Sequence, residues 1–135
     1  MSACLTVVAV TTDLNAADEI FDPAYLSDVA ASLSLDRLTA LLNSYFGHTN
    51  EQLARIDALL AEGNLVPITA EAHALVGSAG NFGAVCVSAL ARKLEQASKQ
   101  SQLDVVTILA TDLRRASDLA SMAMSDWLKG QLDAV

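Results

Sequence analysis

The sequence predicts an all-α protein, an antiparallel four-helix bundle with a short additional N-terminal helix. Hydrophobic residues make up 53% of the chain, aromatic residues only 4%, and there are two prolines. This composition favours helices over sheets. Apolar residues also recur in alternating steps of three and four, the spacing of a helix that packs against other helices. The 135 residues are enough for one domain with a single core.

The first helix is expected from about Pro23 to Ser32. Asp22 offers a capping side chain, and proline suits the first position of a helix because its missing N–H has no partner there. We expect residues 1–20 to form an N-terminal arm that is loop-like or partly ordered. Residues 21–130 are expected to form the bundle domain.

A long second helix is expected from about Leu35 to Ala61, with Ser34 as its cap. Its apolar seam continues in phase through Gly47, so we predict one helix; the alternative is two helices split at Gly47–Asn50. The seam residues repeat at near-heptad spacing: Leu38, Leu42, Tyr45, Thr49, Leu53, Ile56 and Leu60.

Three further helices complete the predicted bundle. The segment 62–64, Glu-Gly-Asn, is expected to end the long helix and to cap a third one, with Pro67 in its first turn. This third helix should extend to about residues 79–82, the fourth from about 84 to 99, and the fifth from near Gln102. The predicted seam of the third helix is Ile68, Ala72, Leu75, Ala79 and Phe82, and that of the fourth is Cys86, Leu90, Leu94 and Ala97. The predicted seam of the fifth helix is Leu103, Val106, Ala110, Leu113, Ala116, Ala120, Met124 and Trp127.

Charge and cysteine content exclude several classes of function. The formal net charge of −8, from 16 acidic against 8 basic residues, argues against binding nucleic acid or an anionic membrane surface. Cys4 and Cys86 are too few for a disulfide framework or a dedicated zinc site, and the sequence is compatible with the cytoplasm, where we expect it. No apolar run approaches the roughly 18–20 residues that span a bilayer.

His73 is the candidate functional residue. At about 100° per residue it lies opposite the seam of the third helix, so its ring should face solvent. Small neighbours share its face: Val66, Ala70, Gly77 and Gly80. Glycine costs a helix about 0.5–1 kcal/mol relative to alanine, which suggests that something must approach the ring closely. Ser78 lies about 140° around the helix from His73, a poor position for a nucleophile with this histidine as its base.

The residues around His73 resemble the signature of the histidine phosphotransfer (HPt) domain family. That family's pattern is roughly HxLKGSS, a hydrophobic residue plus glycine, then a helix that ends in Leu-Glu. The matching residues here are the segment 73–79 (HALVGSA), the segment 82–84 (FGA), Leu90 and Leu94-Glu95. The segments FDPAYL, LLNSYF and EGN also lie where that family has its equivalents, so the resemblance covers about residues 21–127.

The resemblance implies a phosphoryl carrier rather than a stand-alone catalyst. His73 would accept a phosphoryl group from the aspartate of a response-regulator receiver domain and pass it to another receiver. The implied partners are receiver domains and a hybrid sensor kinase. No cofactor is expected on this chain, since Mg²⁺ would be bound by the receiver. We expect a monomer.

Several readings of the site stay open. The family commonly has Lys three residues after the histidine, where this chain has Val76; Arg92 or Lys93 on the next helix are alternative sources of that charge. Gly77, Ser78, Gly80 and Val76 are the candidate supporting residues, although Ser78 also fits a plain small-residue contact. Ala70, Leu26 and Val29 are candidate docking residues for a partner, and the last two fit the core equally. Val76 favours a second hypothesis, a non-catalytic helical adaptor. A metal site of His73 and Cys86 is disfavoured, because two ligands on different helices do not enclose a metal.

Overall fold

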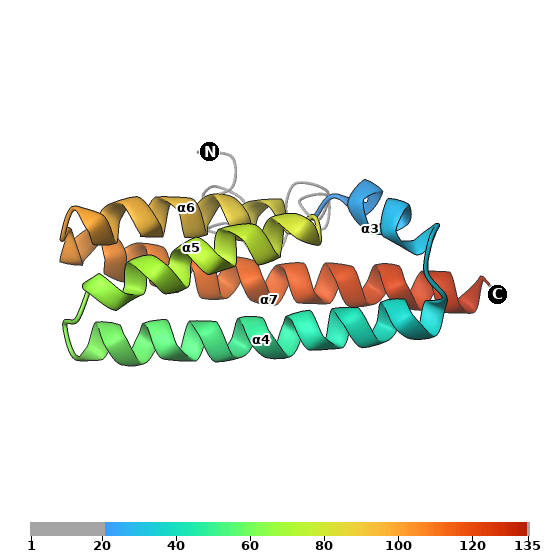
Figure 1. Cartoon of the computed structure of the whole chain (residues 1–135), viewed down its shortest axis with the longest axis horizontal. Helices are drawn as coiled ribbons and strands as arrows, with labels where there is room; N and C mark the ends of the chain where they lie inside the picture. Colours follow the sequence, from blue (N-terminus) through green and yellow to red (C-terminus); the bar gives the residue numbers. More distant parts are fainter. Residues whose placement is uncertain (1–20, 135) are drawn as a thin grey trace.

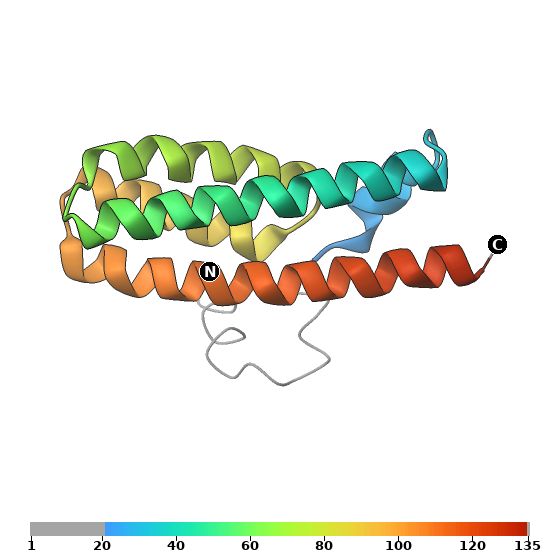
Figure 2. The same ribbon diagram turned by 90° about the horizontal axis from the view of Figure 1, so that it is seen from below.

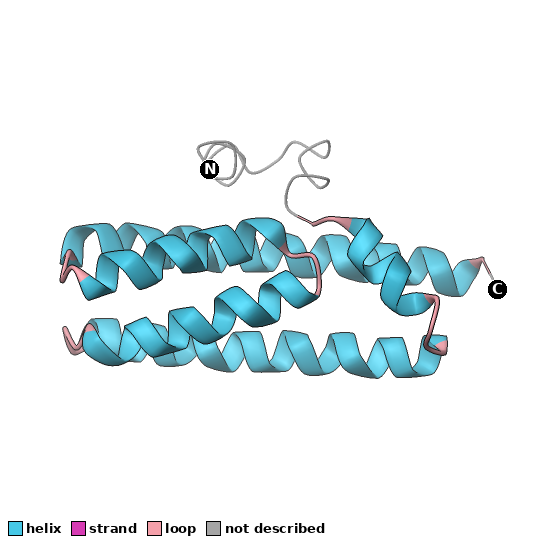
Figure 3. Cartoon of the chain, turned by 45° about the horizontal axis from the view of Figure 1, so that its top comes forward, coloured by secondary structure: helices cyan, strands magenta, loops and turns pink. Residues whose placement is uncertain are grey.

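The computed structural model describes residues 21–134, and the expected N-terminal arm lies outside them. Every regular element of this range is a helix (Figure 3). Their bounds are Pro23–Ala30 for α3, Leu35–Ala61 for α4, Val66–Asn81 for α5, Val85–Lys99 for α6 and Leu103–Asp133 for α7. The predicted single helix is confirmed, since α4 runs through Gly47 without a break, and the alternative of two helices split at Gly47–Asn50 is wrong.

Helices α4 to α7 form an antiparallel bundle in which successive helices reverse direction (Figure 1). The two long helices, α4 and α7, extend past one end of the α5–α6 pair, as the view from below also shows (Figure 2). The short α3 lies across this extension. The predicted architecture, a four-helix bundle with one short additional helix, is therefore confirmed.

Local capping explains where the first helices begin. The Asp22 side chain accepts a hydrogen bond from the Ala24 N–H at 3.0 Å, and the Ser34 hydroxyl oxygen accepts one from the Arg37 N–H at 3.2 Å. These bonds satisfy N–H groups that have no partner within the helix. The expected capping of α5 by the segment 62–64 is wrong, because Leu65 is the N-cap residue and α5 has no side-chain cap bond.

Two turns end their helices with a glycine in the left-handed conformation. After α4 the Asn64 N–H donates to the Leu59 carbonyl and Gly63 has φ of +69°. After α5 the Ala84 N–H donates to the Ala79 carbonyl and Gly83 has φ of +78°. This is the Schellman motif, which glycine accommodates without a Cβ penalty.

Gly83 also joins α3 to the bundle. Its carbonyl accepts a hydrogen bond of 2.8 Å from the Asp22 N–H, and a Cβ built on it would stand 2.7 Å from the Asp22 carbonyl oxygen and 3.0 Å from Tyr25 Cβ. Nearby, the Phe21 ring meets Trp127 edge-on, with ring centroids 6.5 Å apart. These contacts place α3 against the end of the α5–α6 pair.

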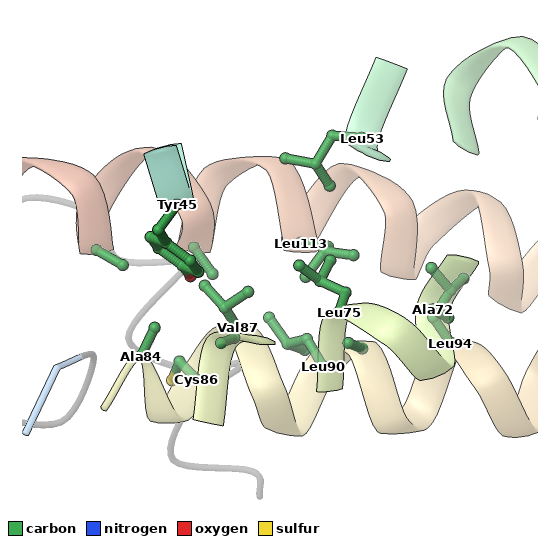
Figure 4. Packing of buried hydrophobic residues seen from close by; sticks show 14 of the residues in the cluster. Tyr45, Leu53, Ala72, Leu75, Ala84, Cys86, Val87, Leu90, Leu94 and Leu113 are labelled. Atoms are coloured by element: carbon green, nitrogen blue, oxygen red, sulfur yellow. The ribbon is translucent and has the colours of Figure 1, made fainter. Parts of the chain in front are cut away.

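The core runs along the inside of the bundle, and leucine and alanine dominate it (Figure 4). The predicted seam of α5 is buried at Ile68, Ala72, Leu75 and Ala79, and the α4 seam is buried from Leu38 through Ile56. Leu103 was expected on the seam of α7 but is about half exposed, because it is the first residue of the helix and lies at the rim of the bundle.

Candidate functional site

His73 lies near the middle of α5, on the face turned away from the core, and its side chain is 75% exposed. One turn further along the same face, Gly77 is exposed and has no other side chain close to it, since a Cβ built there would meet no atom within 4 Å. Gly80 is half-buried, and a Cβ there would lie 3.6 Å from the Ser88 hydroxyl oxygen. The solvent-facing ring with an open neighbouring turn agrees with the geometry expected from the sequence.

The imidazole is held from the neighbouring helix. His73 Nδ1 lies 3.0 Å from Oε2 of Glu95 on α6, and the Glu95 side chain is only 12% exposed. An ionised carboxylate can only accept hydrogen bonds, so Nδ1 must carry the proton and donate it. In the neutral ring this leaves the lone pair on Nε2, the nitrogen on the opposite side of the ring. Glu95 therefore fixes both the tautomer and the direction of the ring.

A chain of hydroxyl groups fixes how α5 and α6 are aligned. The Ser98 hydroxyl donates to the Glu95 carbonyl at 2.9 Å, which uses its only proton. The Thr69 hydroxyl, 2.7 Å away, must therefore donate to Ser98. Further along, the Ser88 hydroxyl donates to the Val76 carbonyl at 2.9 Å. These contacts on both sides of His73 hold Glu95 level with the ring (Figure 1 shows α5 and α6 side by side).

A surface groove of about 590 Å³ opens beside the ring at the α5–α6 junction. It is lined by Val66, Thr69, Ala70, His73, Glu95, Ser98, Lys99 and Ser101. Val66 is 82% exposed, so the far end of the groove presents an uncovered apolar side chain. Lys99 contributes the basic side chain of this groove, and its Nζ lies 3.6 Å from Glu95 Oε2.

The structure brings some predicted residues to His73 and separates others from it. Ala70 lies beside the ring in the groove. Val76 is half-buried and packs against the core. The Ser78 hydroxyl is directed at its own helix, donating to the Leu75 carbonyl at 3.4 Å. Arg92 and Lys93 line a different groove, next to Gly80 and Tyr25.

The prediction that Leu26 docks a partner is corrected. Its side chain is fully buried, and Val29 is half-buried against the core. The physical reason is the position of α3 over the end of the bundle, where its apolar face covers core that α5 and α6 leave open. Both residues thus follow the alternative reading, a place in the core.

Two residues of the site escaped sequence reasoning as partners of His73. Glu95 was visible only as the last residue of the helix signature, and Lys99 had no signal of its own. The one available hint was their spacing, because residues four apart share a helix face. Which side of α6 meets α5 depends on the alignment of the two helices, and a single sequence does not reveal it.

Within residues 21–134 no three histidine, cysteine or acidic side chains gather closely enough to hold a metal ion. In the same range no helix combines the length and the apolar character needed to cross a membrane.

Comparison with known proteins agrees with the fold. The crystal structure of histidine-containing phosphotransfer protein B (HptB) from Pseudomonas aeruginosa PAO1 matches with a TM-score of 0.76, over 82% of this chain and 95% of that one. The two share 20% sequence identity, so the likeness concerns the fold. No curated protein matches the chain. The model of the Hpt domain matches residues 40–120, which include His73, Glu95 and Lys99. Because this match spans more than half of the sequence, the chain belongs to the Hpt domain family.

Proposed function

We propose that His73 accepts a phosphoryl group from the aspartyl phosphate of a response-regulator receiver domain and passes it to another receiver. The observation that carries this proposal is the contact between His73 Nδ1 and Glu95 Oε2 on an otherwise exposed ring. It leaves Nε2 as the nitrogen with an available lone pair, on the side of the ring away from Glu95. The open turn at Gly77 gives a second protein room to reach it.

The transfer requires no proton to leave the ring. The Nε2 lone pair attacks phosphorus, the N–P bond forms, and the bond from phosphorus to the receiver's aspartate oxygen breaks. The aspartate leaves as a carboxylate. The ring keeps its Nδ1 proton and becomes positively charged, and Glu95 lies 3.0 Å from that proton to stabilise the charge. Transfer to the second receiver is the same step in reverse.

The partner supplies the rest of the chemistry under this proposal. Mg²⁺ on the receiver would neutralise the phosphoryl oxygens in the transition state, while this chain presents and orients the nucleophile. The partners are receiver domains, including the receiver of a hybrid sensor kinase. The chain acts as a carrier and, as we propose, as a monomer.

A non-catalytic adaptor is the second candidate. The observation that favours it is Val76, half-buried at the position where the family commonly has a cation. An adaptor would use the same bundle surface to bind signalling partners without phosphotransfer. His73→Gln would then leave partner binding and cellular output unchanged.

The test uses phosphorylated receivers from the same genome as a panel. Each is mixed with the wild-type chain and with His73→Gln, and movement of the labelled phosphoryl group is followed. We expect label on the wild type from at least one receiver and none on His73→Gln. His48→Gln is the matched control, since His48 is exposed on α4 and should leave transfer unchanged. If no receiver labels the wild type, the carrier proposal fails.

A further inference from the structure

Lys99 and His73 share one carboxylate oxygen. Lys99 Nζ lies 3.6 Å from Glu95 Oε2, and His73 Nδ1 lies 3.0 Å from the same atom. The Lys99 side chain is about half exposed and lines the groove that opens beside the ring. As an ion pair between residues four apart on one helix, it contributes little to stability on a protein surface. The ammonium group is therefore held weakly and is easily redirected.

Phosphorylation would change the charge balance at this site. A phosphoryl group brings a charge of about −1.5 to −2 and three acceptor oxygens, next to a site that already contains the Glu95 carboxylate. Helix α5 offers no compensation, because its residues 66–81 include no lysine or arginine. Arg92 and Lys93 lie in a different groove, next to Gly80. Among the residues that line the groove of His73, Lys99 is the one with a positive charge.

We infer that Lys99 is the residue that positions the phosphoryl group on His73. On phosphorylation its ammonium group leaves Glu95 and binds the phosphoryl oxygens, while Glu95 keeps the Nδ1 proton of the charged ring. The modified site then holds two adjacent ion pairs, one on each side of the imidazole. The flexible four-carbon stem of lysine allows this exchange, which makes and breaks no covalent bond. This inference rests on the proposed function and adds to it where the cation comes from.

The geometry favours this exchange on electrostatic grounds. The phosphoryl group is more highly charged than a carboxylate and offers more acceptors, so an ammonium group in the groove that His73 also lines would prefer it. Leaving Glu95 costs little, because Glu95 retains its contact with the imidazolium. The family commonly has a positive charge at the position of Val76 on α5. Here Lys99 supplies that charge from α6, on the groove side of the ring.

The test places the phosphoryl group on His73 chemically, with phosphoramidate, so that no partner is needed. Nε2 attacks phosphorus, the P–N bond of phosphoramidate breaks, and ammonia leaves. The phosphoryl group is then titrated by ³¹P NMR in the full chain. A nearby cation stabilises the dianion, so Lys99→Gln should make the group bind its second proton roughly three- to tenfold more tightly. Lys99→Arg, which keeps the charge, should restore most of the wild-type behaviour.

Lys93→Gln is the matched control, with the same change of charge on the same helix but in the other groove. Equal titrations in wild type and Lys99→Gln would overturn the inference, and so would an equal effect of Lys93→Gln. Both results would leave the carrier proposal standing. A His73 that phosphoramidate does not label would count against the carrier site itself. Labelling with a Lys99 effect, but no exchange with any receiver, would support the inference and refute the proposed partner reaction.

Discussion

Gly77, one turn after His73, can be replaced by a larger residue without disturbing the fold. Its substitution therefore tests whether this glycine is needed for function or for structure. Gly77 lies inside α5 and is exposed, and a Cβ on it would touch no atom within 4 Å. Gly77→Ala therefore carries no steric cost within the chain, and the exposed position leaves the Cβ of Gly77→Leu equally free. Both residues are better helix formers than glycine by about 0.5–1 kcal/mol, so both variants should be more stable than the wild type. For a domain of this size that corresponds to a rise in melting temperature of about 2–4 °C.

Phosphotransfer should respond in the opposite direction. A side chain at position 77 is one turn after His73, and long helical side chains lean back over the preceding turn. Leucine at this position would lie across the approach to the ring, whereas alanine would protrude little. Because a displacement of about 1 Å can cost a hundredfold in rate, we expect Gly77→Leu to slow transfer from a receiver by on the order of tenfold or more, and Gly77→Ala by much less.

Gly47 provides the matched control. It also lies inside a helix, is exposed, and has no atom within 4 Å of a built Cβ, but it is on α4. Gly47→Leu should gain similar stability and transfer at the wild-type rate. The assay pairs thermal unfolding with single-turnover transfer from one phosphorylated receiver. If Gly77→Leu transfers as fast as Gly47→Leu, the argument that the small residue admits a partner is wrong.

Three further variants test other parts of the structure. Glu95→Ala should slow transfer about tenfold, because it removes the hydrogen bond from a charged group that orients His73. Glu95→Gln should lose less, since its amide oxygen can still accept the Nδ1 proton. Equal rates in wild type and Glu95→Ala would contradict the orienting role. Gly83→Ala should lower the free energy of unfolding by about 2–3 kcal/mol or more, because the positive φ and the close approach of Asp22 both oppose a Cβ. A denaturant titration measures this, and an unchanged unfolding midpoint would refute it. Burial raises the pKa of Tyr45 from 10.0 to about 12. The folded state therefore keeps a proton that the unfolded state loses above pH 10. The free energy of unfolding should fall by up to about 2–3 kcal/mol as pH rises from 10 to 12. Tyr45→Phe should lack this loss, and parallel pH profiles of unfolding for the two proteins would show that Tyr45 does not titrate in this way.

Local rules predicted most of the fold because they act within a few residues of the chain. The caps at Asp22 and Ser34 form as expected, and the continuous seam through Gly47 does give one helix. The exposure of His73 also follows from its angle to the seam of α5 alone. In each case the deciding contacts lie within one helix or its first turn.

The residues missed were those whose role depends on how two elements meet. Glu95 reaches His73 only because hydroxyl contacts at Thr69 and Ser88 fix the alignment of α5 with α6. Leu26 is buried because α3 lies over the end of the bundle, and the pattern of eight residues does not say which surface they cover. Such contacts join residues 12 or more apart, so no periodicity in the sequence reports them.

The exposure of the site suits a group that must be given away again. Since 1.4 kcal/mol changes an equilibrium tenfold, a carrier that bound its phosphoryl group by several kcal/mol would receive it and keep it. A buried ion pair at His73 would be costly to break, whereas pairs at the surface are worth about 0–1 kcal/mol. The ring is 75% exposed and Lys99 about half exposed, so under the proposed function water would weaken each contact that holds the phosphoryl group. Only Glu95, at 12% exposure, is held firmly, and it acts on the ring rather than on the group being transferred. Rigid orientation of the nucleophile with weak retention of the phosphoryl group is the combination that the proposed transfer in both directions would require.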